Sequence, residues 1–492
     1  NPMKEIDSSI TQYNNSILRK GLSAYKGVIC IVLGCKSMYN KYAYSKYEGE
    51  AKVALDKFAS DYIDFLSRSK TERVFTKNAT ELAEKFGFKD INSVKSLKAG
   101  DKVYSINRGK NIALFVIGKE DIEKGINILG AHIDSPRLDV KQNPLYESTG
   151  FALLDTHYYG GVKKYQWVTI PLAIYGTVYK KDGSEIEIQI GDDEKDPVFG
   201  ISDLLIHLSA DQMQKPASTF IEGENLDLTV GSLPVKDGEK DSIKANVLRL
   251  LKEKYDIEEE DLASAELEIV PAGKAREYGL DRSMIAGYGH DDKVCAYTSL
   301  RAILETEKPE RTSCCILVDK EEIGSVGATG AQSRYFENLI AEVMNLKGEY
   351  NELALRRALT NSRMLSSDVS AGVDPLFLSV NELKNSAYLN KGIVFNKYTG
   401  SRGKGGCNDA SPKFIAHLRK IMDEDNVYYQ TSELGKVDQG GGGTIAYILA
   451  NLNMDVIDAG VAVLNMHAPM EIVSKIDVYE AYLAYKTFLI KG

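Results

Sequence analysis

Several features that would assign the chain to a specialised class are scarce. Among 492 residues there are only six cysteines and one tryptophan, and no two cysteines form a Cys-x-x-Cys pair. Disulfide frameworks are typical of small secreted chains, so here we interpret the cysteines as small buried residues or as free thiols of a reducing compartment. This interpretation favours a cytoplasmic location.

The chain also lacks long apolar segments and an excess of positive charge. Its longest apolar stretch, residues 27–34, is far shorter than the roughly 20 residues that a membrane-spanning helix needs. Lys and Arg number 61 against 70 Asp and Glu, which gives a net charge of −9 with both signs interspersed. A basic surface is typical of nucleic-acid-binding proteins. We therefore expect neither a membrane nor a nucleic acid as a partner.

The composition is that of a globular protein, and the length predicts two or more domains. Hydrophobic residues make up 43% of the chain and charged residues 27%. Apolar residues at three- and four-residue spacing predict helices between residues 47 and 86, and apolar runs predict strands at 111–118 and 126–131. After residue 289 the same patterns predict helices at 292–306, 335–342 and 474–489, with strands at 313–318 and 460–464.

The segment between residues 143 and 270 differs from its flanks. Alternating apolar and polar residues at 167–179 and 185–191 predict antiparallel strands, joined by a hairpin turn at 180–183. Charged stretches in the same segment are typical of surface loops. We predict that residues 143–270 form a domain inserted into an α/β catalytic domain. That domain would consist of residues 1–142, of which 1–45 are an N-terminal extension, and 271–492.

Possible metal ligands gather where predicted strands end or helices begin. These stretches are His132-Ile133-Asp134, Asp291-Asp292, Glu321-Glu322, Ser367-Asp368 and Asn465-Met466-His467. In open α/β sheets, ligands bind at the carboxyl ends of the strands. Zinc takes nitrogen and oxygen donors, and a catalytic zinc site keeps one position open for water. The five stretches together predict a site for a pair of metal ions.

Each stretch has a plainer interpretation when it is considered alone. A single histidine is more often exposed or satisfied in the core, the Asp291-Asp292 pair can cap a helix, and the Glu321-Glu322 pair can lie in a solvated loop. In combination, one aspartate of the pair would bridge two metals, because negative charge between two dications offsets their repulsion. One glutamate would bind metal while its neighbour takes a proton from the attacking water. Asp134 would hydrogen-bond the far nitrogen of His132.

Seven stretches, in sequence order, are GAHIDSPRLDVK, LLIHL, DDKVCAYTSLRA, DKEEIGSVGATGAQS, LSSDVSAGVDP, QGGGGTIA and LNMHAPMEI. They resemble the dinuclear zinc aminopeptidases of the aspartyl aminopeptidase and aminopeptidase I group. The resemblance runs from about residue 65 to the C-terminus. It implies a zinc-peptidase α/β/α sandwich as the catalytic domain and a mainly antiparallel β insertion that serves as a dimerisation domain. The family usually assembles as a tetrahedral dodecamer.

The resemblance also implies a ligand set for two zinc ions per subunit. One ion would be held by His132 and Asp368, and the other by Glu322 and His467. Asp291 would bridge them, because the bridging aspartate of the family precedes an Asn or Asp, and here the next residue is Asp. Cobalt or manganese would suit the same donors.

Three further residues have roles implied by the resemblance. Glu321 would be the general base, Asp134 would orient His132, and His207 would reach into a neighbouring subunit's active site to stabilise the tetrahedral intermediate. Taken alone, His207 reads as a core-facing histidine on a helix. The implied reaction removes the N-terminal residue from peptides with a free N-terminus, by means of a water activated between two metals.

The preferred N-terminal residue and the reaction class have alternatives. Aspartyl aminopeptidases have a lysine in an Ile-Lys-x-Asn-like stretch that favours acidic side chains, whereas Val394 stands at that place here. Lys397, Arg402 or Lys404 could substitute, so acidic and neutral or apolar first residues are both candidates. Another dinuclear metallohydrolase, a deacylase or a carboxypeptidase, is the alternative enzyme. A non-catalytic metal-containing assembly that binds peptides is the alternative from another class.

Overall fold

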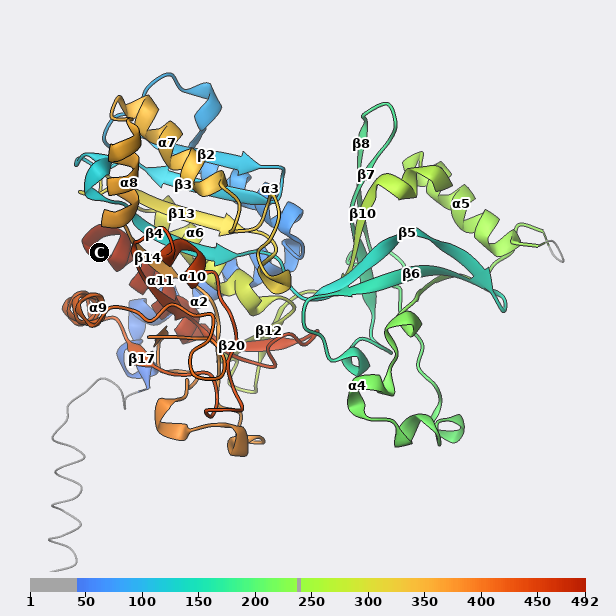
Figure 1. The fold of residues 1–492 in the computed structure, drawn as a ribbon. Coiled ribbons are helices and arrows are strands. Elements are labelled where there is room, and N and C mark those ends of the chain that lie inside the picture. The colour runs from blue at the N-terminus through green and yellow to red at the C-terminus, as the bar shows by residue number, and fades with distance from the viewer. Residues whose placement is uncertain (1–41, 237–239) are drawn as a thin grey trace, which may run out of the picture. The chain divides into compact units, whose positions relative to one another are not determined.

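Residues 42–236 and 240–492 are described by a computed structural model of the chain (Figure 1). The fold is mixed α/β, as predicted, and its described strands form a nine-stranded, a six-stranded and a five-stranded sheet. The apolar stretch at 27–34 lies outside the described residues. No described helix is long and apolar enough to cross a membrane.

The nine-stranded sheet contains most of the strands predicted outside the middle segment. Its order is β1 (Lys89–Asp90), β2 (Lys102–Asn107), β3 (Asn111–Val116), β13 (Ser313–Val318), β4 (Asn127–His132), β14 (Arg363–Ser366), β18 (Asp455–Gly460), β16 (Ile393–Asn396) and β17 (Tyr429–Thr431). The four strands β13, β4, β14 and β18 are parallel neighbours. Every residue of β3, β4 and β13 is buried, as expected for strands covered on both faces.

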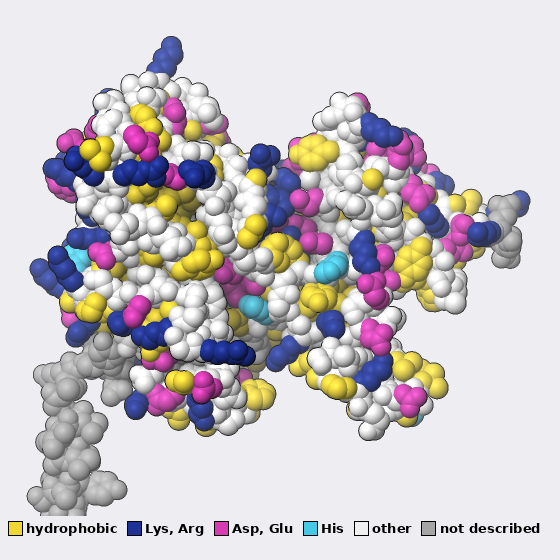
Figure 2. All heavy atoms as spheres, in the orientation of Figure 1, with side chains coloured by type: hydrophobic (Ala, Val, Ile, Leu, Met, Phe, Trp, Pro, Cys, Tyr) yellow, Lys and Arg dark blue, Asp and Glu magenta, His cyan; other side chains and the backbone are white. Residues whose placement is uncertain are grey.

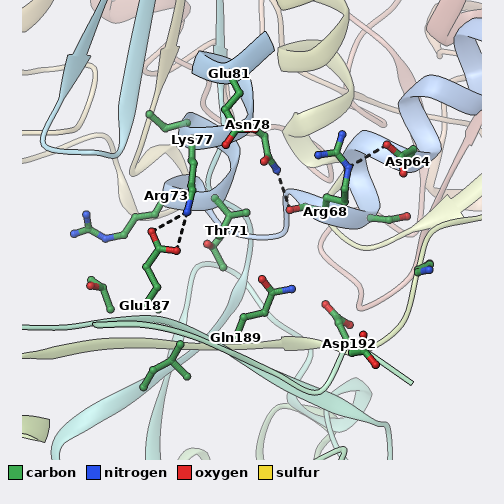
Figure 3. A pocket seen from close by; sticks show the side chains of 18 of the residues that line it. Asp64, Arg68, Thr71, Arg73, Lys77, Asn78, Glu81, Glu187, Gln189 and Asp192 are labelled. Atoms are coloured by element: carbon green, nitrogen blue, oxygen red, sulfur yellow. Dashed lines mark hydrogen bonds and ion pairs between the residues drawn. The ribbon is translucent and has the colours of Figure 1, made fainter. Parts of the chain in front are cut away.

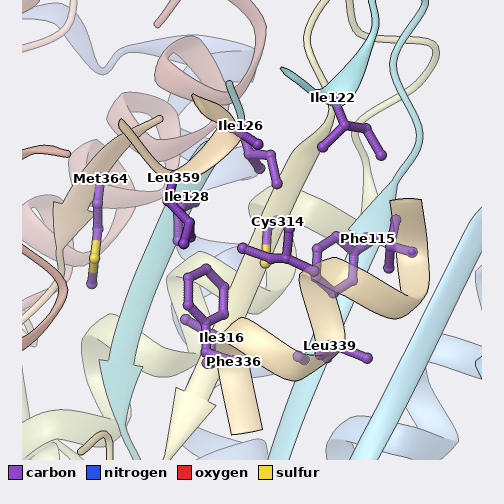
Figure 4. Close-up of a cluster of buried hydrophobic side chains, with 14 of the residues drawn as sticks. Phe115, Ile122, Ile126, Ile128, Cys314, Ile316, Phe336, Leu339, Leu359 and Met364 are labelled. Carbon is purple, nitrogen blue, oxygen red and sulfur yellow. The ribbon is translucent and has the colours of Figure 1, made fainter. Parts of the chain in front are cut away.

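Helices cover both faces of this sheet. On one face α7 (Tyr335–Lys347), α8 (Glu352–Asn361) and α10 (Ala446–Ala450) pack into a core with strand residues such as Phe115, Ile128 and Ile316 (Figure 4). On the opposite face, the long buried helices α6 (His290–Leu304) and α11 (Lys475–Lys491) contact β4 and each other. The helices α2 (Gly49–Arg68) and α9 (Pro412–Glu424) pack against α11, while α3 (Glu72–Lys85) packs against β2 and β3.

The predicted helices and strands agree with this arrangement, with shifted ends. The predicted helical stretch 47–86 is two helices, α2 and α3, which are separated by residues 69–71. The helix predicted at 335–342 continues to Lys347. The strand predicted at 460–464 was wrong as one element, because β18 ends at Gly460 and a separate strand, β19 (Ala462–Leu464), begins in another sheet.

The six-stranded sheet is antiparallel throughout. Its order is β8 (Glu185–Ile190), β7 (Leu172–Tyr179), β10 (Ala265–Pro271), β5 (Arg137–Ser148), β6 (Phe151–Tyr159) and β9 (Leu228–Gly231). The turn at 180–183 joins β7 to β8, and its Gly183 has a φ of +86°. Helix α5 (Ser242–Tyr255) packs against a separate core around the buried Trp167.

The five-stranded sheet brings distant parts of the chain together. Its order is β11 (Arg276–Tyr278), β12 (Met284–Gly287), β20 (Glu471–Ser474), β19 and β15 (Ser370–Ala371). The chain leaves β12 toward Asp291 and turns between β19 and β20 at His467, while Asp368 lies just before β15. Three predicted ligands therefore depend on this small sheet for their positions.

Candidate metal centre

Three of the predicted stretches converge at the carboxyl ends of neighbouring parallel strands. Strand β4 ends at His132, β13 leads into a 3₁₀ helix at Glu321–Ile323, and β14 is followed by Asp368. Because β4 pairs in parallel with both β13 and β14, the three strand ends lie side by side. This is the edge at which open α/β sheets bind ligands.

The remaining two stretches reach the same place from the five-stranded sheet. Asp291 lies in the first turn of α6, where it and Asp292 depart from helical backbone angles, so the regular helix begins after them. His467 lies in the turn between β19 and β20, with a φ of +68°. A left-handed residue in this turn aims the imidazole back toward the strand ends.

Asp291 lies between the two histidines. Its Oδ1 is 3.2 Å from Nε2 of His132, and its Oδ2 is 3.2 Å from Nε2 of His467. Nε2 of His467 is also 3.5 Å from Oε2 of Glu322, and Nε2 of His132 is 4.0 Å from Oδ1 of Asp368. The five side chains thus form two half-sites that share the Asp291 carboxylate.

Both imidazoles are oriented as metal ligands are. Nδ1 of His132 lies 3.2 Å from Oδ1 and 3.1 Å from the main-chain oxygen of Asp134, and Nδ1 of His467 lies 2.9 Å from the main-chain oxygen of Gly161. A neutral imidazole has only one N–H. When Nδ1 donates to these acceptors, Nε2 presents its lone pair to the shared carboxylates. Metal-ligating histidines are typically held in this way, so the donor set fits metal ions.

The charges of the site also suit cations. Burial, together with the charge of nearby carboxylates, raises the pKa of Glu322 and of Asp368 well above the usual range. Burial acts against ionisation of Asp291 as well, but its hydrogen bonds with the two histidines outweigh that effect and lower its pKa. Oε1 of Glu322 is buried and has no hydrogen-bond partner among the described residues. Bound cations would favour the charged form of every carboxylate here.

Two sets of donor atoms lie within 4.8 Å of one another. One set comes from His132, Glu321 and Asp368, and the other from His132, Asp291 and Glu322. The carboxylate of Glu321 therefore lies beside the first half-site and can reach a molecule bound there. His132 belongs to both sets, as expected for a side chain next to the shared Asp291.

Asp134 was predicted to hydrogen-bond His132, and it also accepts hydrogen bonds from other residues of the site. Besides His132, it accepts hydrogen bonds from the main-chain N–H groups of Glu321 and Glu322, each at 3.2 Å. It is fully buried, and its hydrogen bonds with His132 overcome the effect of burial and lower its pKa. One carboxylate thus fixes a histidine and the backbone of the glutamate pair together.

Glu471 performs the same task for the other half of the site, and sequence reasoning missed it. Its Oε2 accepts from the main-chain N–H of Asp291 at 2.9 Å, and its Oε1 accepts from that of His467 at 2.7 Å. The side chain is buried. An acidic residue that opens a buried strand, four positions after His467, is the only local signal that could have indicated this role.

A cavity of about 500 Å³ opens beside the five predicted ligands. Asp291, Glu321 and Glu322 line it, together with Asn396, Ser432 and the glycines at 441–443. On the visible face in Figure 2, acidic side chains and a histidine lie together in a recess, while the surrounding surface mixes both charges. The cavity offers a substrate access to the half-sites.

A larger hollow, of about 1290 Å³, lies elsewhere, between α2 and α3 and the strands β7 and β8 (Figure 3). It contains none of the predicted site residues. Two of the charged pairs on its walls join Lys77 Nζ to Glu187 at 2.8 Å and Arg68 Nε to Asp64 at 3.0 Å. We therefore place the candidate site at the smaller cavity, which is lined by predicted ligands, and not at this larger hollow.

His207 lies apart from this group of side chains. It is in a short 3₁₀ helix, Ile206–Leu208, and both it and its neighbours are exposed. The plainer interpretation of a core-facing histidine on a helix was wrong, because the side chain of His207 is exposed to solvent. Within the described residues no hydrogen bond or ion pair joins His207 to the metal centre.

The family model and the relative that match this chain both describe M18 aminopeptidases. The family model described as aminopeptidase I zinc metalloprotease (M18) matches residues 65–489. The probable M18 family aminopeptidase 1 of Clostridium acetobutylicum is 59% identical over 454 residues, which cover 91% of this chain and 98% of that protein.

Solved structures show the same similarity. The crystal structure of aminopeptidase I from Clostridium acetobutylicum has a TM-score of 0.86 at 56% identity, covering 92% of this chain and 99% of that one. The crystal structure of the M18 aminopeptidase from Thermotoga maritima has a TM-score of 0.89 at 45% identity. The match covers 93% of this chain and 100% of that one. The mApe1 dodecamer of S. cerevisiae is similar in fold, with a TM-score of 0.72 at 22% identity, covering 88% and 97%.

Proposed function

Because the chain belongs to the aminopeptidase I zinc metalloprotease (M18) family, we propose that the metal centre described above is its active site. The chain is a metal-dependent aminopeptidase and thus a hydrolase of peptide bonds. A deacylase, a carboxypeptidase and a non-catalytic assembly are not favoured by these relatives. The observation that carries the site assignment is the position of Asp291, which directs one oxygen toward each histidine.

Five side chains would hold two zinc ions in each subunit. His132 and Asp368 would bind one ion, Glu322 and His467 would bind the other, and Asp291 would bridge them. Each ion would then have three protein donors and a free position, as catalytic zinc sites do. Bound zinc supplies a water of lowered pKa and polarises the scissile carbonyl. Cobalt or manganese would suit the same donors.

Glu321 is the side chain that we assign as general base. The five proposed ligands do not include Glu321, and its carboxylate lies within 4.8 Å of donor atoms of His132 and Asp368. Burial raises its pKa to about 7, which suits a group that accepts a proton near neutral pH. Glu321 takes the proton of the attacking water and delivers it to the leaving amine, while Asp134 holds the backbone of Glu321 in place.

The substitution Glu321→Gln tests this assignment. We expect the variant to retain two zinc ions per subunit and to lose turnover of an unblocked leucyl-nitroanilide by at least about 100-fold, the size of effect that general-base catalysis supplies. Glu322→Gln, at the neighbouring position, should instead lose zinc. N-blocked analogues should remain uncut by the unmodified enzyme. Near-normal turnover by Glu321→Gln would show that another group takes the proton.

The first side chain of the substrate is expected to be neutral or apolar rather than acidic. Val394 is buried in β16, and Lys397 and Lys404 pair with Asp409 at 2.8 Å and 3.2 Å. The only charged side chain lining the cavity apart from the metal centre is Glu433, counted over the described residues. Rates for peptides that begin with Asp, Glu, Leu, Ala or Lys would test this preference.

We propose that residues 143–270 form a dimerisation domain inserted into an α/β/α catalytic domain of 1–142 and 271–492, with 1–45 as an extension. The separate antiparallel sheet supports an inserted domain, and its strand β5 begins at Arg137, six residues before the proposed boundary. Leu205 and Ile206 are 54% and 68% exposed beside His207, and exposed apolar patches mark association sites. These dimers would assemble into a dodecamer, the state in which the similarly folded mApe1 of S. cerevisiae was solved, and His207 would reach a neighbouring subunit's site. Free cysteines agree with a cytoplasmic enzyme.

A further inference from the structure

Residues 159–161, the last residue of strand β6 and the two that follow it, contact both halves of the metal centre. The hydroxyl of Tyr159 donates a hydrogen bond to Oδ2 of Asp134 at 2.8 Å. Two residues later, the main-chain oxygen of Gly161 accepts from Nδ1 of His467 at 2.9 Å. Strand β6 belongs to the six-stranded sheet, whereas the residues that it contacts belong to the other two sheets or follow them.

We propose that Tyr159 and Gly161 are positioning residues that set the orientation of both zinc-binding histidines. Gly161 acts on His467 directly, and Tyr159 acts on His132 through Asp134. The six-stranded sheet would thereby control the affinity of the catalytic domain for its metals. This inference rests on the ligand assignment made under the proposed function.

The hydroxyl of Tyr159 completes the set of donors around Asp134. Oδ1 of Asp134 faces His132 and the N–H of Glu321, while Oδ2 accepts from the N–H of Glu322 at 3.2 Å and from Tyr159 at a shorter distance. Without the hydroxyl, Oδ2 would keep one long hydrogen bond, and the carboxylate could rotate. Burial and the nearby carboxylate raise the pKa of Tyr159 far above its usual value, so the hydroxyl remains a donor.

The ring of Tyr159 is itself fixed from the other side. The guanidinium of Arg137 lies 4.0 Å from the ring centroid, and Arg137 pairs with Glu72 at 3.2 Å and with Glu268 at 3.1 Å. All three charged side chains are buried. Glu72 opens α3 of the catalytic part, while Glu268 lies in β10 of the six-stranded sheet. A buried ion cluster where these parts meet therefore determines where the tyrosine hydroxyl points.

The two glycines after Tyr159 allow the chain to pass close to the ligands. A Cβ on Gly161 would lie 3.2 Å from Nδ1 of His467, and a Cβ on Gly160 would lie 3.2 Å from Cβ of Glu322. Gly160 also has a φ of +75°, which disfavours any larger residue. Gly161 has no such backbone requirement, so Gly161→Ala acts mainly by pushing on the imidazole.

The test compares Tyr159→Phe with Tyr175→Phe. Both tyrosines are buried in the same sheet and both donate to a carboxylate, but Tyr175 donates to Asp192, away from the metal centre. Tyr159→Phe keeps the ring over Arg137 and removes only the hydroxyl. Zinc affinity is measured by competition with a chromogenic chelator, and ligand geometry is read from the visible absorption of the Co²⁺-substituted protein.

We expect Tyr159→Phe to bind zinc about 3- to 10-fold more weakly, less than the roughly 10- to 100-fold cost of losing a direct partner of a ligand. Gly161→Ala should lower affinity at the second half-site and change the Co²⁺ spectrum. Tyr175→Phe should match the unmodified protein in both measurements. Unchanged affinity and spectra in both Tyr159→Phe and Gly161→Ala would overturn the inference, and Gly161→Ala decides alone if Tyr159→Phe does not fold.

Failure of this inference is distinguishable from failure of the proposed function. An unmodified protein that does not bind two zinc ions contradicts the ligand assignment itself. An unmodified protein that binds two ions, with variants that bind them equally well, contradicts only the role of residues 159–161.

Discussion

At the scale of single residues, the centre depends on which carboxylates are ionised. Asp291 keeps a lowered pKa because it faces two histidines, whereas burial raises the pKa of Glu321 to about 7. The two side chains are therefore suited to different tasks. A carboxylate that stays ionised can bridge two cations, and one that titrates near neutral pH can carry a proton.

The pH dependence of turnover follows from Glu321. A general base is active when ionised, so kcat/KM should fall as the pH drops through its pKa. Bound dications lower that pKa, so the decline should begin at or below about pH 7 and approach tenfold per unit of pH. A kcat/KM profile of the unmodified enzyme measures this limb, and any residual turnover of Glu321→Gln should lack it. A profile that stays level down to about pH 5 would contradict the assignment.

Glu471 gives a second prediction at this scale. In Glu471→Gln, an amide N–H₂ would face one of the two main-chain N–H groups that the carboxylate now satisfies. We expect a loss of about 1–3 kcal/mol in the free energy of unfolding, together with weaker zinc retention. Denaturant unfolding and metal analysis after dialysis measure the two effects.

Asp477→Asn is the matched control for that variant. Asp477 is also buried and accepts two main-chain hydrogen bonds, from Asn390 and Gly392, but it holds a loop rather than the metal ligands. It should lose stability without losing zinc. Equal zinc retention by the two variants would show that Glu471 has only a structural role.

The sequence indicated the proposed ligands and Asp134, but not the other residues that hold them. His132, Asp368 and His467 could be predicted because each follows a strand end and has a residue type that binds metals. Tyr159 and Gly161 carry no such mark, since a tyrosine and a glycine at the end of a strand are ordinary. Their role arises from three-dimensional contact between sheets, which neither periodicity nor spacing encodes.

At the scale of elements, a proposed ligand is positioned by the strand that it follows and also by the neighbouring strand that packs against it. Gly460, the last residue of β18, lies so close to Asp368 that a Cβ there would be 1.6 Å from its main-chain oxygen. No backbone shift short of moving the loop after β14 could accommodate a side chain. The glycine is therefore a condition for the position of Asp368.

Gly460→Ala should consequently damage the first half-site. We expect a destabilisation of about 3 kcal/mol, the upper part of the range for overpacking, and loss of zinc from the half-site of His132 and Asp368. Gly200→Ala is the control, because a Cβ there would make only an ordinary 3.5 Å contact. A Gly460→Ala protein that unfolds and binds zinc like the control would contradict this account of the strand packing.

Predicting elements from the sequence worked where burial was uniform. The strands at 111–118, 126–131 and 313–318 were found because both of their faces are covered, which gives continuous apolar runs. The break between β18 and β19 was missed, since one apolar run serves two sheets with a single residue, Val461, between them. The short strands of the five-stranded sheet have too few residues to give a pattern, although three of the proposed ligands lie next to them.

At the scale of the whole molecule, we propose two separate roles for the region of the six-stranded sheet. Its strand β6 reaches the metal centre of its own chain, while the exposed segment around His207 is free to meet another copy. The resemblance to a known family was needed to expect the second contact. In the single chain, only the exposed apolar residues beside His207 indicate that another copy could bind there.

Mixing two inactive variants tests whether His207 acts across subunits. His207→Ala lacks the proposed donor and Glu321→Gln lacks the base, so each should be nearly inactive alone. In mixed dimers, a subunit with intact Glu321 would receive His207 from its partner. Co-refolding the two in equal amounts should restore about a quarter of the sites, as random pairing of isologous dimers allows. Activity equal to the average of the separate variants would place the action of His207 within one chain.

Zinc titration of the metal-free protein tests the central claim most directly. Zinc is added in steps to the chelator-treated protein, and hydrolysis of an unblocked leucyl-nitroanilide is measured together with bound metal, for the unmodified protein and for Asp291→Asn. With a shared Asp291 between two half-sites, activity should saturate at about two zinc ions per subunit, and Asp291→Asn should weaken binding of both ions. Full activity at a single ion, or an Asp291→Asn protein that binds both ions as tightly as the unmodified one, would contradict the account.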